Sequence, residues 1–199
     1  SIINIIAQGD TLYCGTNNGI YYSTDGANLW MAAWSGIINQ QVRGNDFVKS
    51  GDTLFVGTGE TGVISTTWGN TNWSAKGSWP FYSYINNIEL TGNTLCVGMF
   101  DGFYTCPLSG NVWSLNVNGI NEADIRAVYA DDDIMLASVG YIQGVQYSTD
   151  DGLTWQPTSL GNQTYISGFT KVGNYFYAYS SLGGLYRSAD GITFTSTSI

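Results

Sequence analysis

Few residues in this sequence can do acid–base or nucleophilic chemistry. None of its 199 residues is a histidine, which removes the commonest general base and every Ser-His-Asp or Cys-His arrangement. The groups that remain are carboxylates, on 15 acidic residues. Two carboxylates on either side of a sugar can hydrolyse a glycosidic bond. Glu60 and Asp101 fall in corresponding loops of neighbouring repeats, so they are an example of a pair that a glycoside hydrolase could use, although we assign no catalytic residue.

A repeat of about forty residues must position these groups. A glycine opens the same short segment five times, at intervals of 40 to 43 residues: Gly19, Gly62, Gly102, Gly144 and Gly184. An aromatic residue follows each glycine after ten or eleven residues: Trp30, Trp73, Trp113, Trp155 and Phe194. Markers that keep one register over five copies predict a repeat architecture.

Each copy contains four short apolar segments separated by turn residues. A Gly-Asp or Gly-Asn pair typical of a β-hairpin joins the first two segments in most copies, as at Gly9-Asp10. Four-stranded units of this length are typical of propeller blades. We therefore predict an all-β, five-bladed β-propeller with four antiparallel strands per blade. The single domain 1–199 divides into repeats at approximately 1–36, 37–82, 83–121, 122–162 and 163–199, and blade five is expected to close the ring on blade one.

The third turn of the repeat carries a recognisable motif. Residues 148–155, STDDGLTW, match the pattern Ser-x-Asp-x-Gly-x-Thr-Trp at every fixed position. Residues 23–30 keep most of it, with Ala27 in place of the glycine, and residues 188–194 keep the Ser and Asp. The chain thus resembles the Asp-box (BNR) repeat propellers of the sialidase-like fold superfamily. The resemblance implies a propeller but no particular activity, because the motif occurs in glycosidases, sorting receptors and non-enzymes.

Within that superfamily the chain resembles a non-sialidase member. Sialidases use an arginine triad, whereas this sequence has only Arg43, Arg126 and Arg187. We expect the motif residues to hold their own turns and to pack between blades, with calcium binding as the alternative. The residues given this structural Asp-box role are Ser23, Asp25, Trp30, Ser148, Asp150, Gly152, Trp155, Ser188 and Asp190.

The two faces of such a propeller differ in composition. The hairpin face carries the turns between strands one and two and between strands three and four, and it receives nine of the acidic residues. The loop face carries the loops between strands two and three and the connections between blades, including the aromatic-rich segment 74–86. Aromatic rings beside carboxylates and amides suit a sugar site. The candidate ligand contacts, all on the loop face, are Trp34, Glu60, Trp79, Tyr82, Asp101 and Tyr141.

Composition excludes several partners. A net charge of −9 repels nucleic acid and anionic membranes, and no segment is apolar enough for membrane insertion. Three cysteines do not make a disulfide framework, and we expect no cofactor and no metal. The N-terminal segment lacks the features of a signal peptide, so we expect a mature form or an excised domain.

These observations favour a non-catalytic recognition module of a secreted or cell-surface protein, glycan-binding or adhesive, whose partner is a glycan or another surface protein. Its short loops leave little material for a catalytic pocket. The alternatives are a glycoside hydrolase that uses paired carboxylates, and a structural or protein-interaction domain of a larger surface protein or filament.

Overall fold

The computed structural model describes residues 1–37, 42–79, 84–122, 124–131, 133–140, 142–161, 165–181 and 184–197. Within those ranges the chain forms five sheets of four antiparallel strands and no helix. The same residues accordingly contain no helix long and apolar enough to cross a membrane. The fold is an all-β, five-bladed β-propeller, as the repeat predicted.

Each blade is one contiguous repeat. Blade one contains β1 (Ile2–Gln8), β2 (Thr11–Thr16), β3 (Gly19–Ser23) and β4 (Met31–Ala32). Blade two contains β5 (Gly44–Ser50), β6 (Thr53–Thr58), β7 (Val63–Thr67) and β8 (Ser74–Ala75). Blade three contains β9 (Ile85–Thr91), β10 (Thr94–Met99), β11 (Gly102–Pro107) and β12 (Ser114–Leu115). Blade four contains β13 (Ile125–Ala130), β14 (Met135–Val139), β15 (Gly144–Ser148) and β16 (Gln156–Pro157). Blade five contains β17 (Ile166–Val172), β18 (Tyr175–Ser180), β19 (Leu185–Ser188) and β20 (Phe194–Thr197).

The first strand of each blade, which we call the inner strand, has a shift in its pairing register near its start. Such a bulge leaves one residue outside the ladder. In blades two and three that residue is an asparagine. The side-chain amide of Asn45 donates to the carbonyl oxygen of Ile85 (2.6 Å), and that of Asn86 donates to Ile125 (2.7 Å). The bulge therefore ties each of these blades to the next one.

The tryptophan that ends the repeated turn packs on the preceding blade. Trp73 meets Tyr13 of blade one edge to face, with ring centroids 6.0 Å apart, and Trp155 meets Phe103 of blade three at 4.8 Å. All four rings are buried. Because a lone blade cannot bury both sides of its sheet, these contacts make the core a series of inter-blade layers.

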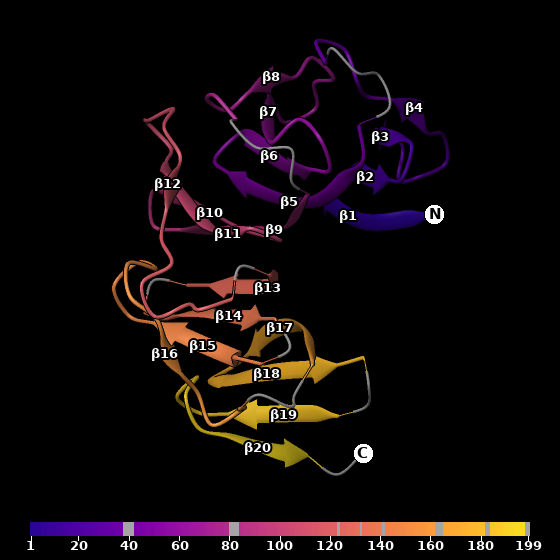
Figure 1. Cartoon of the computed structure of the whole chain (residues 1–199). Coiled ribbons are helices and arrows are strands. Elements are labelled where there is room, and N and C mark those ends of the chain that lie inside the picture. The colour runs from indigo at the N-terminus through magenta and orange to yellow at the C-terminus, as the bar shows by residue number, and fades with distance from the viewer. Residues whose placement is uncertain are drawn as a thin grey trace.

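The five blades form an open arc rather than a closed ring (Figure 1). Successive inner strands are in contact from β1 through β5, β9 and β13 to β17, whereas the described residues show no comparable contact between β17 and β1. Ile2 and Ile5 of blade one are 69% and 49% exposed as a result. The expected closure of blade five on blade one is therefore wrong. A physical reason is Tyr179, whose side chain occupies the place on blade five where a next inner strand would pack.

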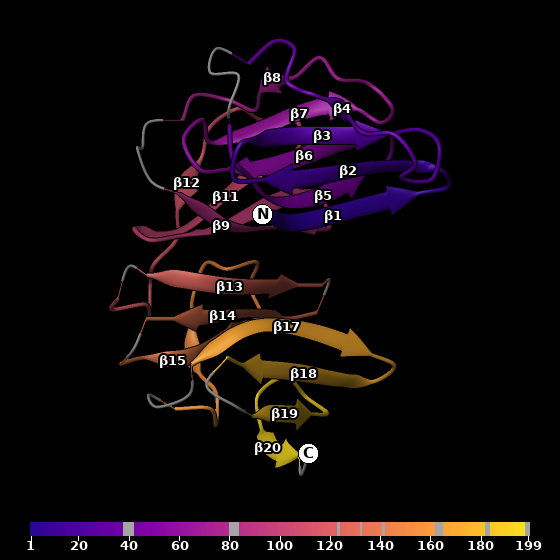
Figure 2. The same cartoon turned by 90° about the vertical axis from the view of Figure 1, so that its right-hand side faces the viewer.

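Strand direction separates the two ends of the blades. Figure 2 shows the inner strands β1, β13 and β17 running the same way, with β2 and β18 returning beside β1 and β17. The turns after inner strands and the turns before fourth strands thus lie on the hairpin face, and the loops after second strands lie on the loop face.

Candidate functional site

On the hairpin face, polar side chains of the repeated turns form hydrogen bonds within their own turns. Ser148 Oγ donates to Asp150 Oδ1 (2.8 Å) and accepts from the backbone N–H of Gly152 (2.9 Å). Asp150 accepts from both the hydroxyl and the backbone N–H of Thr154, at 2.6 and 2.8 Å. These bonds, that of the Thr154 hydroxyl first, lower the pKa of Asp150. The carboxylate is therefore engaged within its own turn.

The corresponding turns of blades one and five make the same serine–aspartate hydrogen bond, although the turn of blade five is one residue shorter. Ser23 Oγ lies 2.8 Å from Asp25 Oδ1, and Ser188 Oγ lies 2.7 Å from Asp190 Oδ1. Backbone N–H groups of each turn are the main cause of the lowered pKa of Asp25 and of the pKa of about 2 of Asp190. Ala27, in the place of the motif glycine, has a φ of +72°, a region that costs energy for a residue with a Cβ.

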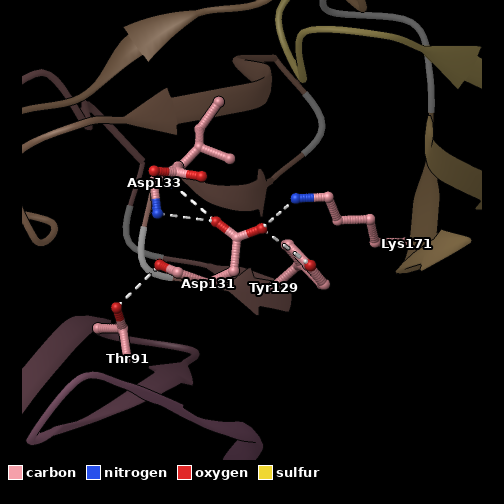
Figure 3. A network of polar contacts seen from close by, with 6 residues as sticks. Thr91, Tyr129, Asp131, Asp133 and Lys171 are labelled. Atoms are coloured by element: carbon pink, nitrogen blue, oxygen red, sulfur yellow. Dashed lines mark hydrogen bonds and ion pairs between the residues drawn. The ribbon is translucent and has the colours of Figure 1, made fainter. Parts of the chain in front are cut away.

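A further network fixes the turn of blade four on the same face (Figure 3). The Oδ2 atom of Asp131 accepts from the ammonium group of Lys171 (2.7 Å) and from the hydroxyl of Tyr129 (3.2 Å). Its Oδ1 atom accepts from two backbone N–H groups of its own turn. The hydroxyl of Thr91 donates to the Asp131 carbonyl (2.8 Å). Residues of blades three, four and five are thereby joined.

An open pocket of about 320 Å³ lies beside this network, between blades four and five. Lys171, Asn174 and Asp190 contribute polar groups to it, and Phe176 contributes apolar surface. Lys171 is already paired with Asp131, and Asp190 with its own turn. Asp133, Thr149 and Asn174 also line the pocket with polar side chains, and no described pairing engages those side chains.

On the loop face, the residues before the inner strands of blades two and four are fixed beside the loops of their own blades. The backbone N–H of Gly59 donates to the carbonyl of Arg43 (3.0 Å), and that of Gly140 donates to Asp124 (2.7 Å). Arg43 and Asp124 come shortly before the inner strands of blades two and four. The residues that directly precede these inner strands thus lie on the loop face around the axis of the propeller, a region that we call the axial rim.

Two of the three arginines meet tyrosine rings at this rim. The guanidinium carbon of Arg126 lies 4.6 Å from the ring centroid of Tyr165, and that of Arg43 lies 5.8 Å from the ring of Tyr84. Nε and Nη2 of Arg126 also contact Asp124 Oδ2, at 2.7 and 2.6 Å. Tyr84 remains 40% exposed. The rim therefore presents tyrosine rings that contact arginine side chains, with charged, hydrogen-bonding groups beside them.

Behind the rim, the inner strands carry buried polar groups. Asp46 accepts from the side-chain amides of Asn4 and Asn87 and from two backbone N–H groups, although burial still raises its pKa. Glu89 is half-buried, and its burial, with the nearby charge of Asp46, raises the pKa of Glu89 to about 8. Its strand partner is the buried Cys96. Its surroundings therefore favour the protonated form of Glu89, a half-buried residue of the inner strand β9.

The structure assigns packing contacts to both predicted tryptophans. Trp79 is half-buried between blades two and three, with its ring 5.1 Å from Trp113 and 6.2 Å from Tyr104. Trp34 is half-buried against Tyr21 at 5.6 Å. Both rings are thus parts of the blade packing, whatever else they contact.

Of the other four predicted ligand residues, two are exposed and two lie outside the described residues. Glu60 and Asp101 are exposed on the loops of blades two and three, with no contact between their carboxylates among the described interactions. Tyr82 and Tyr141 lie outside the described residues.

Sequence reasoning missed the arginine–tyrosine pairs. It placed the aromatic segment 74–86, which contains Tyr84, on the loop face, but paired no arginine with a tyrosine. The available signal was the repeat phase, because Tyr84, Asp124 and Tyr165 each directly precede an inner strand.

Comparison with known proteins gives no family. No family model matches the sequence, and no curated protein sequence matches it.

Solved structures do resemble it. The extracellular domain of BT4673 from B. thetaiotaomicron superimposes with a TM-score of 0.78 over 99% of this chain and 28% of that one, at 14% identity. The GH74 enzyme of Niastella koreensis gives 0.72 over 93% of this chain and 36% of its own, at 18% identity. YCF48 of Cyanidioschyzon merolae gives 0.68 over 98% of this chain and 70% of its own, at 16% identity. The chain thus spans only part of each, and shares with them the β-propeller fold.

Proposed function

We propose that this chain is a non-catalytic recognition module of a secreted or cell-surface protein and that it binds glycans through its loop face. The observation that carries the proposal is the pair of arginine–tyrosine contacts at the axial rim, Arg43 with Tyr84 and Arg126 with Tyr165. A guanidinium group against one side of a ring holds the ring in place. The exposed part of Tyr84 can then stack on the C–H face of a sugar.

The polar groups of the rim suit sugar hydroxyls. Asp124 and Arg126 are held together yet keep 23% and 25% of their side-chain surface exposed. They supply an acceptor and donors beside the rings, which is the mixture of apolar and convergent polar groups that small-ligand sites use. Propeller neighbours that include a GH74 enzyme and an extracellular domain are consistent with a surface role.

A hydrolase is less well supported. A glycosidase holds its two carboxyl groups across the scissile bond, and its general acid needs a raised pKa. Glu60 and Asp101 are exposed on short loops. Among the described residues, the carboxyl group with a strongly raised pKa is Glu89, which lies within the inner strand β9 rather than on a loop.

A glycan array with the purified chain tests the proposal. The best-bound glycan is then titrated by calorimetry against Tyr84→Ala and Arg126→Ala. We expect each variant to weaken binding about tenfold or more, because each removes a stacking ring or its guanidinium partner.

Tyr175→Ala is the matched control. The guanidinium carbon of Arg187 lies 4.6 Å from the Tyr175 ring, so the chemistry is the same, but Tyr175 begins β18 on the hairpin face. Its affinity should match that of the unmodified chain. If binding survived both rim substitutions and disappeared with Tyr175→Ala, the site would lie on the hairpin face and the proposal would be wrong.

A further inference from the structure

Each blade has two sides with distinct roles. We call the side toward the next blade in sequence its forward side and the other its backward side. At the interface of blades one and two, the forward side contributes Tyr13 and Ile20, and the backward side contributes Leu54, Val56 and Trp73. The same positions meet at the other three interfaces. A backward side is therefore built to receive a forward side.

The backward side of blade one is built like the others, but no blade packs on it; Cys14 is buried there, Leu12 and Trp30 are half-buried, and the inner strand is exposed. Leu12, Cys14 and Trp30 stand at the positions of Leu54, Val56 and Trp73 in the repeat. Ile2 and Ile5, on the inner strand of the same blade, are 69% and 49% exposed. A shallow pocket of about 190 Å³ opens there, lined by Ile2, Cys14, Thr16, Tyr21 and Trp30. Its lining holds no charged residue, which favours an apolar partner over an acidic or basic one.

Small residues mark the forward sides that receive a blade. The second strands of blades one to four carry one at the same register position: Gly15, Gly57, Gly98 and Ser138. A Cβ on Gly57 would lie 2.6 Å from Ile85 Cγ2, and one on Gly98 would lie 2.7 Å from Ile125 Cγ2. The next inner strand therefore occupies the space above this position.

Blade five breaks the rule at that position. Tyr179 stands there, paired with Gly168 of the inner strand. A Cβ on Gly168 would lie 2.5 Å from Tyr179 Cε1, so the tyrosine ring covers the glycine, and Tyr179 is 50% exposed. The ring fills the space that a next inner strand would need. The Tyr179 ring thus blocks the forward side of blade five, and we call this ring the plug.

We propose that the backward side of blade one is a docking surface for the forward side of another propeller blade, one with Gly or Ser at the position of Gly15. Blade five of the same chain or of a second copy is excluded by Tyr179. Three observations select this occupant. The surface matches the four interfaces already formed, and its pocket lining carries no charge. The forward side of blade five is blocked by Tyr179.

The test supplies such a blade. A copy of residues 85–123 is fused directly before Ser1, because the Ser1 carbonyl accepts from Asn17 N–H as the Asp124 carbonyl accepts from Gly140. The fusion is made in an Ile5→Cys background with Cys96→Ala and Cys106→Ala in the added copy, and the three cysteines of the natural chain are buried. We expect the thiol at position 5 to react with Ellman's reagent at least about tenfold more slowly than in the unfused Ile5→Cys chain.

The control fusion carries Gly98→Tyr in the added copy only, with circular dichroism used to verify that both fusions are folded. This plugged blade should leave the thiol as reactive as in the unfused chain. Equal reactivity of the unplugged fusion and the unfused chain would overturn the proposal, and so would equal protection by the plugged blade.

A second measurement examines the plug without any fusion. Sedimentation should find the natural chain monomeric. Tyr179→Gly should associate with increasing concentration, because blade five can then meet blade one of another copy, and Ile5→Lys should abolish that association. Association of the natural chain to the same extent as Tyr179→Gly, or none by Tyr179→Gly, would contradict the role given to Tyr179.

Discussion

Replacement of Glu89 by glutamine should stabilise the protein at neutral and alkaline pH. Glutamine keeps the shape of the side chain but cannot ionise. In the folded chain, burial and the charge of Asp46 raise the pKa of Glu89 from 4.5 to about 8. The folded state therefore disfavours ionisation of this carboxyl, whereas the unfolded chain does not.

The sign and size follow from these two pKa values. Between pH 4.5 and about 8 the folded state holds a proton that the unfolded state has lost, so the free energy of unfolding falls as pH rises through this window. Each pH unit in the window is worth about 1.4 kcal/mol. The penalty carried by the natural chain is thus on the order of 3 kcal/mol at pH 7, and Glu89→Gln removes it.

Urea unfolding followed by tryptophan fluorescence at several pH values measures this difference. The two proteins should have equal stability near pH 4, and the variant should gain steadily from pH 5 to 8. Glu60→Gln, an exposed carboxylate of a neighbouring blade, is the control and should show no such gain. A difference that does not change with pH, or a natural chain that is the more stable at pH 8, would refute the reasoning.

Three other predictions concern the repeated turn. Ala27→Gly should raise the free energy of unfolding by about 1 kcal/mol, because φ at position 27 is +72°; a lower urea midpoint would contradict this. Trp155→Ala should cost on the order of 3–5 kcal/mol, since this ring is buried against Phe103, whereas Trp30→Ala should cost clearly less because its side of blade one is open; equal losses in urea melts would count against the open side. Asp190→Asn should destabilise the protein at pH 7 but make no difference once the pH falls below about 2, because the stability that the low pKa of Asp190 confers is lost as the carboxylate is protonated between pH 4 and 2; acid titrations of both proteins by circular dichroism check it.

The blades could be predicted from the sequence because their signals repeat. One glycine and one aromatic position, found five times in register, fix the number of blades and the order of strands. The Gly-Asp and Gly-Asn turns then set the hairpins. Ring closure could not be read in this way. One residue that bears on it is Tyr179, which stands where blades one to four have Gly or Ser and looks like an ordinary strand residue until its partner Gly168 is known.

The candidate site was harder to predict for a related reason. A sequence shows which residues lie on the loop face, but not which rings are consumed by packing. Trp79 looked suited to a ligand, yet it lies between blades two and three. Tyr165 drew no attention, because the rim pairs join different blades and only the fold brings Arg126 to it.

Mapping a bound glycan onto the two faces tests the central claim most directly. The chain is labelled with ¹⁵N and titrated with the glycan that the array identifies, and amide shifts are followed. The account predicts perturbations around Tyr84, Asp124 and Tyr165 and none around Asn174 or the turns at Asp25 and Asp150. Perturbations confined to the pocket beside Asn174 and Lys171, or an array on which no glycan binds, would contradict it.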